Sequence, residues 1–462
     1  MQQNKRLYAL EHEKVSKLLL RYSIPAVVGA MVNALYNIVD RIFIGQGVGD
    51  EAIAGLAITF PILLFSQAFG MLVGSGASVR IAILLGRKDQ AMAEKVLGNS
   101  LYLTFFFNLV VCLLGYLYME PLLRLFGATN TILPYAKEYL MIALGFNIFA
   151  DLSFSYNAVI RSTGYPTKAM LSMILGALLN CVLDPLFIFG FKWGIAGAAW
   201  ATNISMVVTA LFVMSHFFNS KSVVTFRKES FAFSWVSMKS ILAIGVSPFA
   251  MMLVNSVINI VINRSFNLYG SSEFETTNAI AAYGIIIGIS QLFIQFMVGV
   301  SQGGQPIMSY NLGAGQALRS IKAYQYAVYV NVLMAFVGLS IALFAPDLFV
   351  RPFNPGEGLM KLTNTAIGIV FLSYPFVGLQ ITTVQFFQSL GLAGKAMFIT
   401  LTRQVIFLIP GLILIPRIAS LGLRGVWIAM PIADGLSGLT ALTMVLIFLP
   451  KIRKKQLEKV LS

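Results

Sequence analysis

The sequence predicts an all-α integral membrane protein with twelve transmembrane helices, arranged as two parallel six-helix repeats around a central cavity. Composition is the first observation, because 58% of the 462 residues are hydrophobic and only 11% are charged. Soluble domains carry roughly 25% charged residues. The second observation is a series of apolar runs that need lipid as their solvent. The third is an internal repeat between the two halves of the chain.

Twelve apolar segments, separated by short polar loops, have the length of membrane-spanning helices. A helix of roughly 20 apolar residues crosses a hydrocarbon core of about 30 Å. Because lipid offers the backbone no hydrogen bonds, each segment is expected to be helical. The predicted cores are 22–44, 52–79, 96–118, 135–158, 169–190, 194–216, 240–266, 279–303, 322–344, 363–387, 397–416 and 422–449.

Basic residues gather in alternate loops, at 5–21, 80–95, 161–168, 221–239, 319–322, 395 and 451–459. The intervening loops carry fewer lysines and arginines and hold acids such as Glu120 and Asp347. The positive-inside rule therefore places both termini in the cytoplasm. The expected location is the cell (inner) membrane, as a multi-pass protein. Membrane lipids are expected partners, because the net charge of +15 is explained by loops that face anionic headgroups. Nucleic acid is not an expected partner.

The second half of the chain repeats the first. Matching stretches are 52–54 with 279–281, 85–86 with 312–313, 164–170 with 391–397, and 194–197 with 422–425. Six spans is an even number, so both halves enter the membrane from the same side and are related by an axis along its normal. The predicted division is an N-terminal lobe at 1–218, a cytoplasmic linker at 219–238, and a C-terminal lobe with a basic tail at 239–462.

Polar side chains inside spans are candidate functional groups, because lipid makes them costly. The first span carries a stripe of them at helical spacing, formed by Asn33, Tyr36, Asn37 and Asp40. The seventh span repeats this stripe with asparagines at 255, 259 and 263, but without a carboxylate. The two halves are therefore predicted to be alike in shape and unlike in charge.

The fifth span adds a second polar cluster. Asn180 and Asp184 share a helix face, and Pro185 removes a backbone donor beside them. Asn180 and Asp184, like Asp40 and Thr202, are expected within the first lobe in the half of the membrane that faces away from the cytoplasm. We expect these four residues to bind Na⁺ through oxygen atoms, or to exchange a proton. Two alternatives stay open: Asp184 braces the Pro185 kink, or Asp40 is a structural residue at a helix end.

Two further intramembrane acids, Asp151 and Asp434, lie away from any polar stripe. Helix packing or interhelical hydrogen bonding is the favoured interpretation for both. Arginine and lysine residues are expected at span ends, which would leave a neutral to acidic central cavity.

These residues resemble the multidrug and toxic compound extrusion family across nearly the whole chain. The strongest marks are Pro25 with the run 36–40, the run 180–185, and the segment 194–202. The resemblance implies a cation-coupling site at Asp40, Asn180, Asp184 and Thr202, with Tyr139 nearby. It also implies a substrate cavity lined by Asn33, Tyr36, Asn157 and Met206. Acids that some branches carry in spans seven, eight or ten are absent, which favours coupling in the first lobe.

The resemblance implies a secondary active transporter that exports cationic amphipathic compounds in antiport with Na⁺ or H⁺ by alternating access. It implies organic cations as small-molecule partners, function as a monomer, and no cofactor beyond the coupling ion. A flippase for a lipid-linked saccharide is the principal alternative, and would need cationic residues in the cavity. A channel fits duplicated halves with one acidic lobe less well. An enzyme is not expected, because the two histidines, His12 and His216, are peripheral.

Overall fold

The computed structural model describes residues 2–270, 273–353 and 356–461, and these residues form an all-helical protein. Among these described residues, ten helices are long and apolar enough to cross a membrane, or up to twelve if each of two bent pairs is one span. The all-α multi-pass fold predicted from the sequence is confirmed.

The first bundle contains the chain up to residue 216. Its elements are α1 (Gln2–His12), α2 (Val15–Gly47), α3 (Asp50–Gly86), α4 (Gln90–Leu117), α5 (Met119–Leu125), α6 (Leu133–Ser162), α7 (Pro166–Pro185), the π-helical η1 (Leu186–Gly190) and α8 (Gly194–Ser215). The amphipathic helix α1 was not predicted, because it lies outside the apolar runs.

The second bundle follows a connecting segment that holds a single short turn, η2 (Lys228–Phe231). Its elements are α9 (Trp235–Tyr269), α10 (Glu273–Gly313), α11 (Ala317–Phe344), α12 (Pro346–Val350), η3 (Arg351–Phe353), α13 (Glu357–Phe371), α14 (Tyr374–Ser389), α15 (Ala393–Leu401), η4 (Thr402–Leu408), α16 (Ile409–Leu414), η5 (Ile415–Ser420) and α17 (Gly422–Leu461).

The fourth and tenth predicted spans, which occupy equivalent places in the two halves, are both bent. The axis turns by 55° between Leu133–Gly145 and Asn147–Ser162, and by 49° between α13 and α14. Pro375 lies in the first turn of α14 and cannot donate a backbone hydrogen bond to the preceding turn. The repeat therefore preserves the break as well as the spans.

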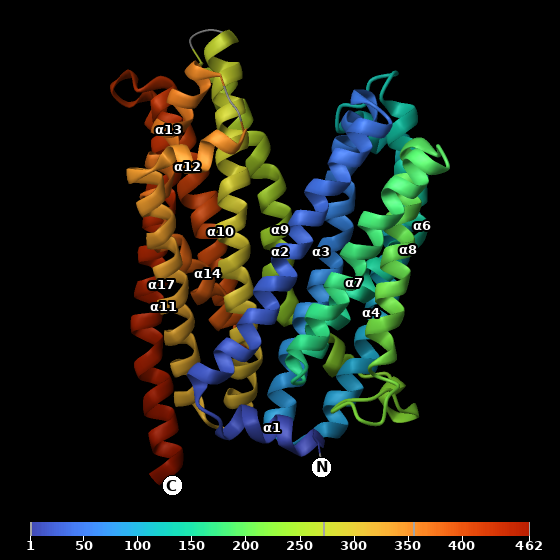
Figure 1. Ribbon diagram of the computed structural model, residues 1–462. Helices are drawn as coiled ribbons and strands as arrows, with labels where there is room; N and C mark the ends of the chain where they lie inside the picture. Colours follow the sequence, from blue (N-terminus) through green and yellow to red (C-terminus); the bar gives the residue numbers. More distant parts are fainter. Residues whose placement is uncertain (1, 271–272, 354–355, 462) are drawn as a thin grey trace.

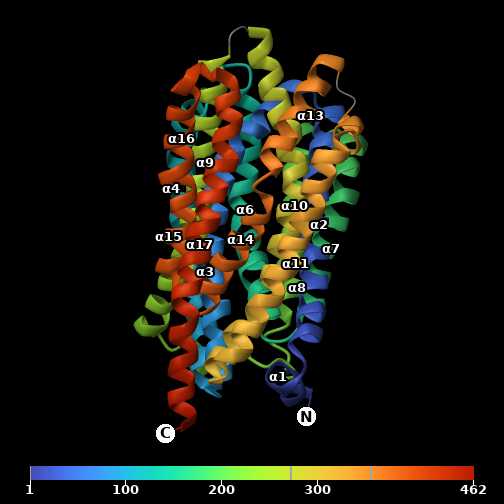
Figure 2. The same cartoon turned by 90° about the vertical axis from the view of Figure 1, so that its left-hand side faces the viewer.

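The two bundles meet near the end that holds both termini and diverge toward the opposite end (Figure 1). The view turned by 90° again places both termini at one end, with α17 running the length of the second bundle (Figure 2). Contacts between the bundles run mainly along α2 with α10, α3 with α9, and α3 with α10.

Glycines set how closely these helices approach. A Cβ atom added at Gly245 of α9 would lie 1.8 Å from the carbonyl oxygen of Leu72 in α3. In the repeat-related contact of α10 with α2, a Cβ at Gly299 would lie 2.7 Å from Cα of Val27. Only hydrogen fits at such positions. The backbones of the two bundles are therefore in direct contact there.

The segment between the bundles is bound to α4 of the first bundle. Glu94 accepts hydrogen bonds from the backbone amide and hydroxyl of Thr225 at 3.3 and 3.2 Å. Asn99 donates to the carbonyl of Ala232 at 3.0 Å and accepts from the amide of Ser234 at 2.9 Å. Most of the segment thus packs as part of the first bundle.

Candidate functional site

Four helices of the first bundle bring the predicted coupling residues together. The side-chain amide of Asn180 in α7 donates to Asp184 Oδ1 and to Thr202 Oγ1 of α8, each at 3.2 Å. Asp184 lies within hydrogen-bonding contact of the carboxyl group of Asp40 in α2. Tyr139 of α6 reaches the hydroxyl of Thr202. We call these five residues the carboxylate cluster.

The carboxylate cluster is shielded from water. Asp184 and Asn180 are 0% and 2% exposed, and Asp40 is 9% exposed. The Oδ2 atom of Asp184 and the Oδ1 atom of Asn180 are buried, and accept no hydrogen bond from any residue in the described ranges. Buried oxygens without a donor are costly. A bound cation or an added proton would remove that cost.

The oxygen atoms that the cluster can offer to a cation decide which ions it could bind. It offers carboxylate, amide and hydroxyl oxygens, the ligands that hard cations prefer. Among the described residues, no group of three or more His, Cys, Asp or Glu side chains could hold a metal ion. Asp184 takes part in none of the salt bridges formed among the described residues. The cluster therefore fits a monovalent hard cation or a proton.

The local sequence explains why α7 presents these groups. Asn180 and Asp184 are four residues apart and lie on one face of the helix. The α-helix ends at Pro185, and the chain continues as the π-helical turn Leu186–Gly190. Such wider turns occur frequently at functional sites. The cluster thus lies at a change of helix type.

The residues predicted to line a substrate cavity lie at different depths. Tyr36 is beside the carboxylate cluster, where it interacts electrostatically with Asp40 and Asp184. Met206 of α8 is half-buried, and its carbonyl accepts a hydrogen bond from Ser153 at 3.2 Å. Asn33 is half-buried on α2, three residues before Tyr36. Their part in substrate binding stays a prediction.

Asn157 lies far from the carboxylate cluster, near the end of α6 toward the termini. Its amide donates to the carbonyl of Ala169 at 2.6 Å and to the hydroxyl of Ser172 at 2.8 Å. Eighteen residues separate it from Tyr139, about 27 Å of helix at 1.5 Å per residue. In this conformation Asn157 joins α6 to the start of α7. The side chains at 37, 255, 259 and 263 lie outside the described residues.

Asp151 belongs to a second polar cluster, and its hydrogen bond to another helix agrees with the interpretation favoured from the sequence, although its partners were not predicted. Its Oδ2 accepts from Asn147 at 3.1 Å and from Asn108 of α4 at 3.2 Å. Asn147 also donates to Ser66 of α3 at 2.6 Å. Asn147 begins the second arm of the bent α6. In the sequence, only the spacing of Asn147 and Asp151, about one helical turn, indicated that their side chains lie on the same face of the helix.

Asp434 corrects one expectation from the sequence. It pairs with Arg403 at 2.5 Å, and Arg403 lies within the span Ala393–Ile418 rather than at a span end. Asp434 also accepts a hydrogen bond from Ser373, at the break between α13 and α14, at 3.3 Å. The second bundle therefore contains an intramembrane cation, and a carboxylate neutralises its charge. An arginine among apolar residues was the signal that the sequence offered.

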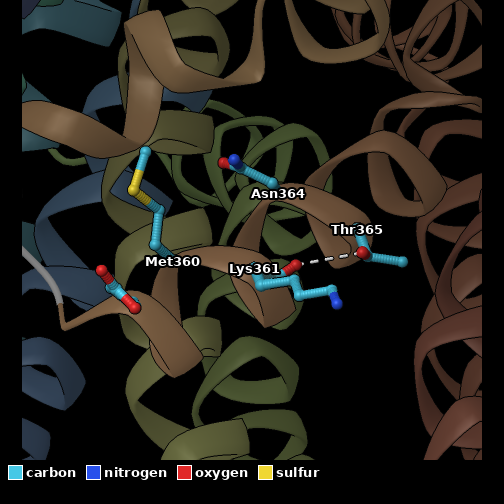
Figure 3. A pocket seen from close by; sticks show the side chains of 5 residues that line it. Met360, Lys361, Asn364 and Thr365 are labelled. Atoms are coloured by element: carbon cyan, nitrogen blue, oxygen red, sulfur yellow. Dashed lines mark hydrogen bonds between the residues drawn. The ribbon is translucent and has the colours of Figure 1, made fainter.

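A separate pocket lies on α13, away from every intramembrane acid. Figure 3 shows Met360, Lys361, Asn364 and Thr365 around it, with Thr365 Oγ1 donating to the Lys361 carbonyl at 3.0 Å. Its volume is about 410 Å³. A lysine and the nearby Glu357 line an open surface at the diverging end, and nothing there resembles the carboxylate cluster.

Comparisons with known proteins agree with this architecture. The family model described as MatE matches residues 25–186 and 248–413, once in each bundle. The multidrug export protein MepA of Staphylococcus aureus (strain MRSA252) is 27% identical over 443 residues, covering 96% of both chains.

Two solved structures are similar over 97% of this chain and 99% of theirs, each with a TM-score of 0.90 and 26% identity. One is the outward-facing conformation of a multidrug resistance MATE family transporter of the MOP superfamily. The other is a MOP superfamily transporter from Pyrococcus furiosus.

Proposed function

Because the chain belongs to the MatE family of membrane transporters, we propose that it exports cationic amphipathic compounds in antiport with Na⁺ or H⁺. The carboxylate cluster is the observation that carries this proposal. It places two acids in contact inside a membrane-spanning bundle, beside buried oxygens of Asn180 and Asp184 that accept no hydrogen bond from the described residues. A site of this kind exchanges small cations, and its charge favours cationic over anionic substrates.

The arrangement of the bundles supports alternating access. With both termini in the cytoplasm, as the basic loops predict, the diverging end of Figure 1 faces outward. The related MepA is a multidrug export protein, which supports an outward direction of transport for a range of compounds.

Antiport follows if the coupling ion and the substrate stabilise different conformations. Ion binding at Asp40 and Asp184 removes the cost of two adjacent buried charges. The carboxylates then no longer attract a cationic compound held near Tyr36. Each ligand weakens binding of the other, and such coupling is reciprocal. Movement of the ion down its gradient thereby drives release of the compound outside.

Efflux from proteoliposomes tests the proposal. Vesicles containing purified protein and a fluorescent organic cation would be given an imposed Na⁺ or H⁺ gradient. We expect gradient-driven efflux from the wild type, and its loss in both Asp40→Asn and Asp184→Asn. Asp347→Asn, at a half-buried acid near the diverging end, is the matched control and should transport normally. Normal efflux by both cluster variants would refute coupling at this site.

The same vesicles distinguish the flippase alternative. An anionic lipid-linked saccharide requires fixed positive charge in the cavity, but Arg403 is paired with Asp434. We therefore expect labelled lipid-linked saccharides to remain in their starting leaflet. Their movement, without any movement of the organic cation, would favour the flippase.

A further inference from the structure

A basic depression lies at the terminal end of the first bundle, where α1 meets the start of α7 and the end of α8. Its volume is about 450 Å³, and Arg6, Tyr165, Thr167, Lys168 and Phe212 line it. It is separate from the carboxylate cluster, because Lys168 lies sixteen residues before Asp184, about 24 Å along α7.

Both cations in the depression are held in place by neighbouring groups. Arg6 donates to the carbonyl of Gly164 at 2.9 Å, and its guanidinium carbon lies 4.1 Å from the centre of the Tyr165 ring. Lys168 Nζ lies 3.4 Å from Nδ1 of His216. Because both side chains are already held in place, they lose less conformational entropy when a ligand binds.

The buried His216 fixes Lys168 without adding a charge. Ser222 Oγ lies 3.1 Å from His216 Nε2, and the Ser222 hydroxyl donates to the carbonyl of Val224 at 2.7 Å. Nε2 therefore carries the hydrogen, and Nδ1 accepts from the ammonium group. Burial, with Lys168 and Arg6 nearby, lowers the pKa of His216 to about 4. The ring is neutral at pH 7.

Within the described residues, neither of the two cations has a carboxylate partner. No ion pair in the described ranges involves Arg6 or Lys168, and no aspartate or glutamate lines the depression. The first turn of α7 starts at Pro166, and its dipole adds positive potential. An anion is the ligand that this charge selects.

The surroundings identify the anion as part of a lipid. Leu171, one turn beyond Lys168, also lines the depression and is 48% exposed. The strip continues along the span with Leu178 of α7 and Leu211 of α8, which are 61% and 62% exposed. A free phosphate would gain nothing from this strip, whereas acyl chains would cover it. We propose that the depression binds the phosphate headgroup of an anionic phospholipid of the cytoplasmic leaflet.

Lipid retention by the purified protein tests this site without measuring transport. Native mass spectrometry would count phosphatidylglycerol retained after mixing with equimolar phosphatidylcholine. Each basic residue near an anionic surface strengthens binding about fivefold, so Arg6→Gln with Lys168→Gln should weaken selective retention at least tenfold. Arg87→Gln with Lys88→Gln, an exposed pair at the same end of the bundle, is the matched control and should retain lipid normally.

A second variant keeps the test independent of folding. Thr167 is exposed in the first turn of α7, where a glutamate favours the helix. Thr167→Glu places a carboxylate between the two cations, and should abolish selective retention without lowering thermal stability in zwitterionic lipid. Thr167→Gln should retain lipid. Equal retention of phosphatidylglycerol by Thr167→Glu and wild type would overturn the proposal. Inorganic phosphate that displaces the lipid at equal concentration would also overturn it, and assign the site to a free anion.

Discussion

The glycine contact between α3 and α9 predicts that one added methyl group will shift the conformational equilibrium. A Cβ at position 245 would lie 1.8 Å from the carbonyl oxygen of Leu72, and real Cβ contacts are essentially never shorter than 3.0 Å. Gly245→Ala therefore forces the two backbones apart by at least the difference, 1.2 Å. Both atoms belong to continuous helices, so no side chain can move aside instead.

The energetic cost follows from overpacking. Adding a methyl group to a tightly packed contact costs about 1–3 kcal/mol. If the contact exists only while the bundles meet at the terminal end, the whole cost acts on that conformation. The population of the conformation in Figure 1 should then fall by about 5- to 150-fold relative to the alternative.

Distances between spin labels at the diverging end measure this shift. Leu125 of α5 and Leu348 of α12 are 77% and 66% exposed, one in each bundle. With Cys112 and Cys181 replaced by serine, labels at the two leucine positions should move closer together in Gly245→Ala. Gly284→Ala is the matched control, because a Cβ there meets no atom within 4 Å. An unchanged distance distribution in a folded Gly245→Ala protein would refute the reasoning.

Three further perturbations test other features. Asp434→Asn leaves Arg403 without its carboxylate and should destabilise the protein by about 3–5 kcal/mol, whereas Asp434→Leu with Arg403→Leu should cost much less; thermal unfolding in detergent compares them, and equal losses would contradict the pairing argument. The pKa of His216 lies near 4 in the folded protein, below its usual 6.5. Between these two pH values the unfolded chain binds more protons than the folded protein, so the stability of the fold decreases as the pH is lowered. By pH 5 the loss should reach about 2 kcal/mol, and it should be absent in His216→Asn; the same loss in that variant would assign it to other groups. Thr202→Val should raise the coupling-ion concentration needed for half-maximal efflux several-fold, with Thr202→Ser close to wild type; no change in Thr202→Val would remove its hydroxyl from the site.

Much of the fold could be predicted from the sequence, because apolar length and the repeat determine which segments cross the membrane. The breaks in the fourth and tenth spans could not be predicted, because the helices on both sides of each break are apolar. Pro375 marks the second break, but Pro25 lies within the uninterrupted helix α2. A proline in a span therefore does not decide by itself whether the helix bends.

The carboxylate cluster could be predicted in part. Asn180 and Asp184 share a helix face by spacing alone, and counting turns from the span ends places Asp40 and Thr202 at a similar depth. Tyr139 came only from family resemblance, because no polar stripe surrounds it. The pairing of Arg403 with Asp434 joins two different helices. Interhelical hydrogen bonding was the favoured interpretation for Asp434, but the sequence does not identify Arg403 as its partner.

The attachment of the connecting segment to α4 determines where the chain can be divided. Hydrogen bonds to Glu94 and Asn99 hold the segment on the first bundle as far as Ser234, which caps α9. A gene split between Phe233 and Ser234 would thus produce a first fragment that includes the connecting segment together with α4. A split near residue 220 would place the connecting segment on the second fragment, and it would then have to bind α4 of the other fragment during assembly. Fragment complementation in cells should therefore succeed at the first position and fail more often at the second.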